Sequence, residues 1–179
     1  MDVTRLSVED LRPEVLDEFD RSQQTRRVRF DDDGVFVERD DSFDDRWDRE
    51  RKREIVSELV TCIEEGGVVV GARGDGGRLV GFANVLARRF GPSEEYVELP
   101  FLHVSAELRG HGLGRRLFTA AADGARLLGA SKLYLAAHPA IATQAFYDSV
   151  GCVRARWIAT DIYDKQPLDI QLEFGLEDD

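Results

Sequence analysis

Residues 109–114 read Arg-Gly-His-Gly-Leu-Gly, and this stretch decides the fold class of the 179-residue chain. It follows an apolar segment at 96–104 and precedes apolar residues at helical spacing, namely Leu113, Leu117, Phe118, Ala121, Ala125 and Leu128. A strand, a glycine-rich turn and a helix in this order leave backbone N–H groups at the helix N-terminus free to face an anion. Glycine suits the turn because it adopts positive φ and lets phosphates approach closely. The sequence therefore predicts an anion-binding turn.

Three kinds of ligand compete for such a turn. A nucleoside triphosphate loop requires Gly-Lys-Ser/Thr after its glycines, whereas this chain has Gly114-Arg115-Arg116. A dinucleotide fold requires Gly or Ala at position 115 and a suitable acidic residue about 20 positions later, and neither is present. The remaining interpretation is a pyrophosphate held by backbone and arginine, without a metal.

The rest of the chain predicts a single α/β domain over residues 1–179. Helices are expected to begin at a Ser7-Asp10 capping box and to cover about 47–65, 113–128 and 143–150. Strands are expected at 68–72, 79–86, 96–104, 132–137, 153–159 and 169–174, with a small hairpin of 28–30 and 35–37. The glycine-started helix makes one parallel crossover between strands.

Pro100 interrupts the expected strand at 96–104. Proline cannot donate to a strand ladder, so it implies a bulge or a broken pairing, or only an irregular edge strand. Strand alternation places Glu98, Leu102 and Val104 nominally on one face, in a phase that a bulge would change.

Two motifs together resemble the GNAT superfamily of N-acetyltransferases. Arg109, Gly112 and Gly114 match the family's Gln/Arg-x-x-Gly-x-Gly/Ala signature, and residues 146–152 are similar to its Phe-Tyr-x-x-x-Gly-Phe segment. The resemblance covers much of 79–153, with departures at Cys152, usually aromatic, and Ala140, often asparagine. It implies a central mixed, mostly antiparallel sheet with splayed fourth and fifth strands, flanked by helices.

The resemblance also implies a chemistry, which is acetyl transfer from acetyl-CoA to a primary amine in a ternary complex. Tyr147 would protonate the leaving thiolate, and Glu98 would take the amine proton; packing and solvated roles are the alternatives for these two. The implied coenzyme-binding residues are Leu102, His103, Val104, Arg109, Gly110, His111, Gly112, Leu113, Gly114 and Arg115. Of Arg115 and Arg116, one is expected at the phosphates and the other in solvent. No cysteine stands at a convincing nucleophile position, and His103, His111 and His138 are too scattered for a metal site.

Composition limits the partners and the compartment. A net charge of −11 argues against nucleic acid or an anionic membrane as the main partner. No apolar run approaches a membrane span and no export signal opens the chain, so the cytoplasm is expected. Asp outnumbers Glu and only three lysines are present, as in a protein from a high-salt cytoplasm or an acidic protein from a GC-rich genome. Cys62 and Cys152 are expected to be small buried hydrophobes.

The acceptor stays open at this stage. A cationic amine, such as a polyamine, an aminoglycoside or a protein amine, fits the acidic surface, although surface charge predicts pocket charge poorly. Arg26, Arg27 and Arg29 either line a site for an acidic acceptor or pair with nearby acidic loops. A coenzyme-binding sensor without turnover is the alternative function. Dimerisation is common in the family, and these residues neither predict nor exclude a homodimer.

Overall fold

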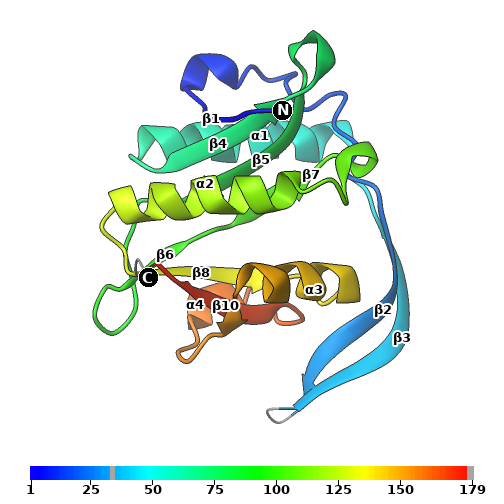
Figure 1. Ribbon diagram of the computed structural model, residues 1–179, viewed down its shortest axis with the longest axis vertical. Coiled ribbons are helices and arrows are strands. Elements are labelled where there is room, and N and C mark those ends of the chain that lie inside the picture. Colours follow the sequence, from blue (N-terminus) through cyan, green and yellow to red (C-terminus); the bar gives the residue numbers. More distant parts are fainter. Residues whose placement is uncertain (33–34, 177–179) are drawn as a thin grey trace.

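The body of the molecule consists of two four-stranded sheets (Figure 1). The computed structural model describes residues 1–32 and 35–176, with side chains outside 30–36 and 42–45. The first sheet has the order β1-β4-β5-β7, formed by Val3–Arg5, Val68–Arg73, Leu79–Val85 and Phe101–Val104. The second has the order β6-β8-β10-β9, formed by Tyr96–Glu98, Lys132–Ala137, Ile170–Gly175 and Val153–Arg154. All neighbours are antiparallel except β6 and β8, which the expected crossover joins in parallel.

Helices α1 (Arg49–Glu64) and α2 (Leu113–Leu127) cover opposite faces of the first sheet. The alternation of β4 shows how the sequence achieves this. Val68 and Val70 pack in the cluster that contains α2, whereas Val69 packs in the cluster that contains α1. Gly124 permits a close approach on the α2 side, since a Cβ there would lie 2.8 Å from Val68 Cγ1. Two hydrophobic layers therefore hold one sheet between two helices.

The segment at 96–104 passes from one sheet to the other, and Pro100 lies at the change. β6 pairs with β8 as far as Glu98, Leu99 donates its N–H to the Tyr134 carbonyl, and from Phe101 the chain pairs with β5 instead. The expected break at Pro100 is confirmed as a change of partner rather than an edge irregularity. β7 and β8 consequently separate, which is the predicted splay of two strands.

The break at Pro100 also changes the phase of the strand. Val97 and Leu99 pack in the cluster around α2 before the proline, and Leu102 and Val104 do so after it. The intervening step of three residues places Glu98 on the face opposite Leu102. The nominal expectation that Glu98 shares a face with Leu102 and Val104 was therefore wrong.

The N-terminal region differs most from the prediction. Ser7 and Asp10 do form a capping box, but it opens only the 3-10 helix Val8–Asp10, followed by turns. Pro13 would fall inside an α-helix begun there and would remove one of its hydrogen bonds. Leu11, Leu16 and Phe19 are nevertheless buried as the periodicity indicated.

Two further elements differ from their expected bounds. The small hairpin is a long one, β2 (Gln23–Asp32) with β3 (Val35–Asp45), and it extends along the side of the molecule to α3 (Ile141–Val150). The strand expected at 153–159 ends at Arg154, and the chain continues to α4 (Thr160–Tyr163). Trp157 packs against Phe90 and Tyr96 there, and this aromatic contact takes the place of further strand pairing.

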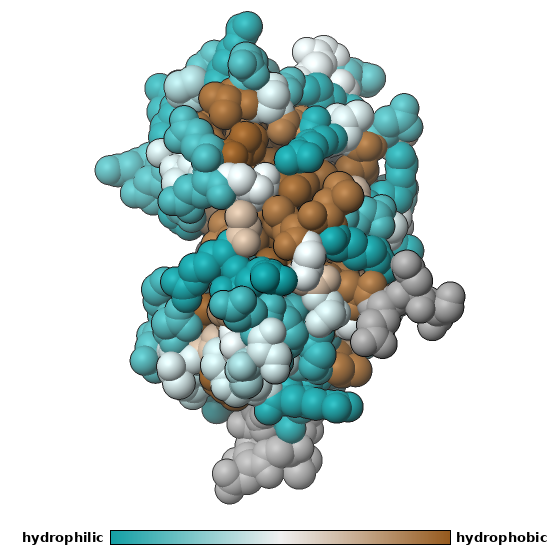
Figure 2. Space-filling view, turned by 90° about the vertical axis from the view of Figure 1, so that its left-hand side faces the viewer, coloured by the Kyte–Doolittle hydropathy of each residue, from teal (hydrophilic) through white to brown (hydrophobic). Residues whose placement is uncertain are grey.

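The face of the molecule in Figure 2 is mostly hydrophilic above and below a narrower middle part. Figure 2 shows a face that narrows between the two halves, where hydrophobic side chains gather. No helix within 1–32 and 35–176 is long and apolar enough to cross a membrane. Cys62 and Cys152 are buried and unpaired, as expected.

Candidate active site

A groove of about 1030 Å³ opens where β7 separates from β8. Four parts of the chain line it: β7, the glycine turn at 109–114 with the adjacent Arg115, one face of α3 from its start to Ser149, and residues 21–27 at the start of the β2–β3 hairpin. Nine of the twelve predicted site residues lie on this lining, namely Leu102, His103, Val104, Arg109, Gly110, Gly112, Gly114, Arg115 and Tyr147. The other three, Glu98, His111 and Leu113, do not line it.

The glycine turn has the backbone that an anion site needs. Gly110 and Gly112 have φ of 77° and 80°, which a side chain would disfavour. Gly112 is the N-cap of α2 and offers no side-chain cap, so the first N–H groups of the helix lack side-chain partners within the described residues. Leu113 is 6% exposed and anchors the start of the helix in the core. The turn therefore presents an uncapped helix N-terminus to the groove.

Arg109 stabilises this turn through its guanidinium. Nε donates to the Val104 carbonyl at 2.9 Å, and Nη1 and Nη2 donate to the Ser22 and Arg21 carbonyls at 2.7 and 3.4 Å. Burial lowers the pKa of Arg109, although the nearby Asp20 and Glu107 oppose that shift. The predicted residue thus lies at the groove, and its recorded hydrogen bonds join β7 to the start of β2.

We expect Arg109→Lys to reduce stability more than its conserved charge suggests. A lysine ammonium cannot reproduce three donors in a fixed planar arrangement, so the free energy of unfolding should fall by about 1–3 kcal/mol. Urea denaturation of the variant beside Arg116→Lys measures this. Arg116 is a suitable control because it lies on α2 and its guanidinium is exposed, 3.6 Å from the exposed Asp2. Equal stability of the two variants would contradict the structural role of Arg109.

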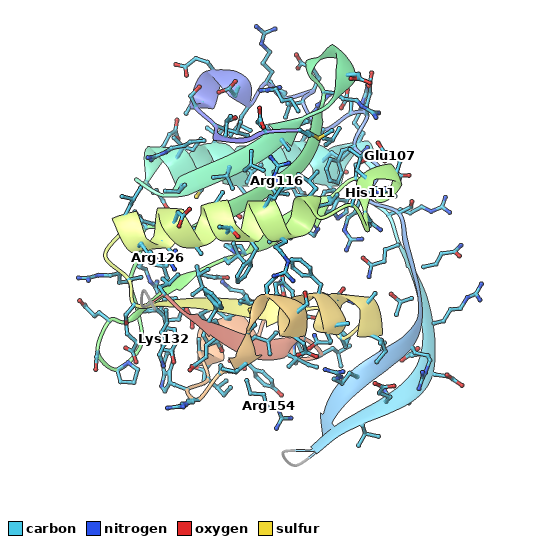
Figure 3. All side chains as sticks on the ribbon, in the orientation of Figure 1. Glu107, His111, Arg116, Arg126, Lys132 and Arg154 are labelled. Atoms are coloured by element: carbon cyan, nitrogen blue, oxygen red, sulfur yellow. The ribbon has the colours of Figure 1, made fainter. Side chains whose placement is uncertain are left out.

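Arg115, Arg116 and His111 lie on different sides of the turn. Arg115 lines the groove and donates to the Ser149 carbonyl of α3 at 2.9 Å, whereas Arg116 points away toward Asp2. His111 is exposed beside the groove, with Nδ1 2.8 Å from the Arg109 carbonyl (Figure 3). One arginine therefore faces the groove, and His111 lies beside it.

Tyr147 is a phenol that α3 brings to the groove lining. It is 8% exposed and packs edge-on against Phe146 and Phe118, with ring centroids 5.0 and 6.4 Å away. Burial raises the pKa of the phenol well above its ordinary value. Tyr147 is therefore a protonated donor at any pH at which the enzyme would be assayed.

Glu98 and His103 share the face of the 96–104 segment that points away from α2. Glu98 lies near Tyr134, and burial raises the pKa of its carboxyl, with Lys165 opposing the shift. His103 packs edge-on against Trp47 at 4.7 Å, and burial lowers the pKa of its imidazole well below the usual value. His103 is consequently neutral at pH 7, and Glu98 takes up a proton more readily than an exposed glutamate.

The hairpin wall is what sequence reasoning missed. Residues 21–27 line the groove, and the only earlier signal was the arginine cluster that includes Arg26 and Arg27. Arg27 pairs with Glu38 at 2.9 Å and Arg29 with Asp148 at 3.0 Å, so the pairing interpretation holds for these two. Arg26 and Arg27 nevertheless lie on the lining, because a register shift interrupts β2 between Thr25 and Arg27.

The described lining of the groove combines cationic, neutral polar and apolar residues. In the part of the chain that the structure describes, no group of three or more His, Cys, Asp or Glu side chains is arranged to hold a metal ion. The groove is lined by five arginines, Arg21, Arg26, Arg27, Arg109 and Arg115, and its described lining includes no carboxylate. The site is built for an anion.

The arrangement resembles several solved structures over nearly their whole length. Nourseothricin acetyltransferase is 20% identical with a TM-score of 0.71, and each chain is covered to 98%. A Bacillus anthracis protein assigned as a streptothricin acetyltransferase, solved with acetyl coenzyme A, is 17% identical with a TM-score of 0.68 and complete coverage of both chains. PaiA N-acetyltransferase from Thermoplasma acidophilum, solved with coenzyme A, is 19% identical with a TM-score of 0.60, covering 97% of this chain and 98% of that one.

At identities of 17–20%, the similarity to these structures establishes the fold alone. No curated protein matches the sequence. The model of the acetyltransferase (GNAT) family matches residues 14–152, which include the glycine turn, β7 and α3. The chain therefore belongs to the GNAT family of acetyltransferases.

Proposed function

We propose that this protein transfers an acetyl group from acetyl-CoA to a primary amine by direct attack in a ternary complex. One observation carries the proposal: a single groove contains an uncapped helix N-terminus, the free edge of β7 and the buried phenol of Tyr147. The helix N-terminus suits the pyrophosphate. The edge of β7 that faces away from β5 offers unpaired N–H groups to the pantetheine amides and the thioester carbonyl.

The proposed reaction uses each group once. The neutral amine attacks the thioester carbonyl carbon, a C–N bond forms, and the C–S bond breaks. Tyr147 gives its proton to the departing thiolate, and Glu98 accepts the proton that the amine loses, directly or through water. No cysteine lies on the described groove lining, and burial raises the pKa of Cys152 to about 12. Direct transfer is therefore favoured over an acyl-enzyme intermediate.

A thiol-release assay tests this function. The chain is mixed with acetyl-CoA and a broad panel of primary amines, at low and at molar salt, and the free thiol is measured. Release that depends on an amine supports the enzyme. Coenzyme A binding without release on any amine favours the alternative, a sensor or interaction module that kept the fold without turnover.

Glu98→Gln should separate catalysis from stability. A glutamine cannot accept the amine proton, so kcat/KM is expected to fall by about 100-fold, and the acidic limb of the pH profile should disappear. The folded carboxyl has a raised pKa and so binds its proton more tightly than the unfolded chain does. Ionised Glu98 therefore destabilises the folded state increasingly as pH rises through the raised pKa of this carboxyl. At neutral pH Glu98→Gln should melt at a higher temperature than the wild type.

Two measurements check this prediction, the kcat/KM profile from pH 5 to 9 and the melting temperature at pH 4 and pH 8. Glu95→Gln serves as a nearby control, since Glu95 precedes β6 and its carboxylate accepts a hydrogen bond from the Ser93 N–H in the preceding turn. If Glu98→Gln keeps wild-type activity, the base lies elsewhere; the neutral His103 on the same face is then the residue to substitute next.

A further inference from the structure

Strand β2 crosses the groove from the glycine turn to the start of α3. At one end the Ser22 carbonyl accepts a hydrogen bond from Arg109 Nη1 at 2.7 Å. At the other end Val28 forms an isolated bridge with Ala140, and the Arg29 N–H donates to the Pro139 carbonyl at 2.8 Å. The intervening residues 23–27 therefore form a fixed wall of the groove, attached at both ends.

The wall faces a second uncapped helix. The N-cap of α3 is Ala140, which has no side-chain cap, so the first-turn N–H groups of this ten-residue helix have no side-chain partner in the described structure. Ala140, Ile141, Ala142 and Thr143 all line the groove. This end of α3 carries the positive pole of the helix and favours a negative ligand group.

Thr25 gives an independent indication of a ligand. Its side chain is only 4% exposed and lies on the groove lining, yet Oγ1 has no hydrogen-bond partner within the described residues. A buried hydroxyl without a partner costs stability, and a ligand that bonds to it recovers that cost. The register shift between Thr25 and Arg27 is the device that turns the strand, since bulges re-aim side chains.

The charge around Thr25 points to the same class of ligand. Arg26 and Arg27 belong to this wall and lie next to Thr25 in the chain. Arg26 makes no ion pair with the residues that the structure describes. The chain as a whole carries −11, but the described lining of the groove has five arginines and no Asp or Glu. The positive potential of the groove is therefore local, and it opposes a polycationic ligand at this position.

We propose that the N-terminus of α3, the Thr25 hydroxyl and Arg26 form a second anion subsite, separate from the glycine turn, for a phosphate or carboxylate group. Two molecules of the proposed reaction can supply that group: the coenzyme through its 3′-phosphate, or the amine acceptor through a carboxylate. The second case rests on the proposed function and narrows the acceptor to amines that bear a carboxylate, in place of the cationic amines that the surface charge suggested.

Binding measurements test the coenzyme as the source. Calorimetry compares coenzyme A with 3′-dephospho-coenzyme A on the wild type, Thr25→Val and Arg26→Gln. If the subsite holds the 3′-phosphate, the wild type prefers coenzyme A by about tenfold or more, and each variant loses most of that preference. Thr25→Ser keeps the hydroxyl and should keep the preference.

Turnover measurements test the acceptor as the source. Amino acids and their carboxamides are compared as acceptors with acetyl-CoA. If the subsite holds the acceptor's carboxylate, KM for the acids rises about tenfold in Thr25→Val and Arg26→Gln, while KM for the amides stays unchanged. The matched control is Arg5→Gln, which removes the same charge from an exposed position on β1, outside the described groove lining.

Thermal unfolding shows whether Thr25 has a structural role instead. Since Oγ1 has no described partner, Thr25→Val should melt no lower than the wild type. A clearly lower melting temperature, or unchanged coenzyme preference without any acid-specific change in KM, would overturn the subsite. If the wild type acetylates no amine, the proposed function is contradicted. The comparison of coenzyme A with 3′-dephospho-coenzyme A then tests the subsite without the turnover measurements.

Discussion

Tyr147→Phe is expected to lower kcat by about 100-fold while the affinity for coenzyme A stays within about twofold, since general acids typically contribute 10²–10⁴-fold. The variant keeps the buried ring between Phe146 and Phe118 and removes only the hydroxyl. A thiolate is a good leaving group, which places the effect at the lower end of that range. Burial keeps the phenol protonated, so the loss should be similar at pH 7 and pH 9.

Three measurements separate this role from packing. Steady-state thiol release gives kcat, calorimetry gives the affinity for coenzyme A, and thermal unfolding gives stability. The hydroxyl makes no hydrogen bond within the described structure, so the melting temperature should not fall. Tyr163→Phe is the matched control, because Tyr163 is 42% exposed on α4. If Tyr147→Phe turned over as fast as this control, the thiolate would take its proton from another donor.

Gly112→Ala is expected to weaken coenzyme A binding by about 10- to 100-fold. Gly112 is the N-cap of α2 at φ 80°, and an added Cβ would meet no protein atom within 4 Å, because it would project into open space on the groove lining. A pyrophosphate that approaches the first N–H groups of the helix would meet that methyl group. The same φ also makes alanine unfavourable, by about 1–2 kcal/mol of stability.

Gly76→Ala separates the stability cost of alanine at positive φ from the loss of coenzyme binding. Gly76 has φ 70° and also open space at its Cβ position, but it lies in the turn between β4 and β5, away from the described groove lining. Both variants should therefore lose similar stability in urea denaturation, and only Gly112→Ala should lose coenzyme affinity by calorimetry. Equal affinities in the two variants would show that the glycine turn does not hold the coenzyme.

Much of the candidate site was readable from short-range patterns. A glycine turn between a strand and an amphipathic helix needs only neighbouring residues to define it. Five of its predicted residues line the groove, whereas His111 lies beside it and Leu113 lies in the core. Pro100 likewise marked the break, because the missing N–H is a local property. Which face of the strand each side chain takes after Pro100 was not predictable. The sequence does not show how many residues the chain needs to pass from one sheet to the other.

The groove wall formed by residues 23–27 is the part of the site that sequence patterns predict least well. Thr25 is an ordinary polar residue in a polar stretch, and nothing local indicates that it is buried. Its strand is held by long-range contacts of the neighbouring residues Ser22, Val28 and Arg29, whose partners are more than 80 residues away in the chain. The charge of the groove has the same origin, because an acidic chain can still collect arginines from separate elements around one cavity.

The sequence by itself determined the family and the turn that opens α2, because both depend on backbone conformation and spacing within a few consecutive residues. The tertiary structure alone decided which side chains surround the groove, which face Glu98 takes, and that arginines rather than carboxylates are present on the described groove lining. These features arise from long-range packing, in which the β2–β3 hairpin and α3 are fixed across the space left by two separating strands.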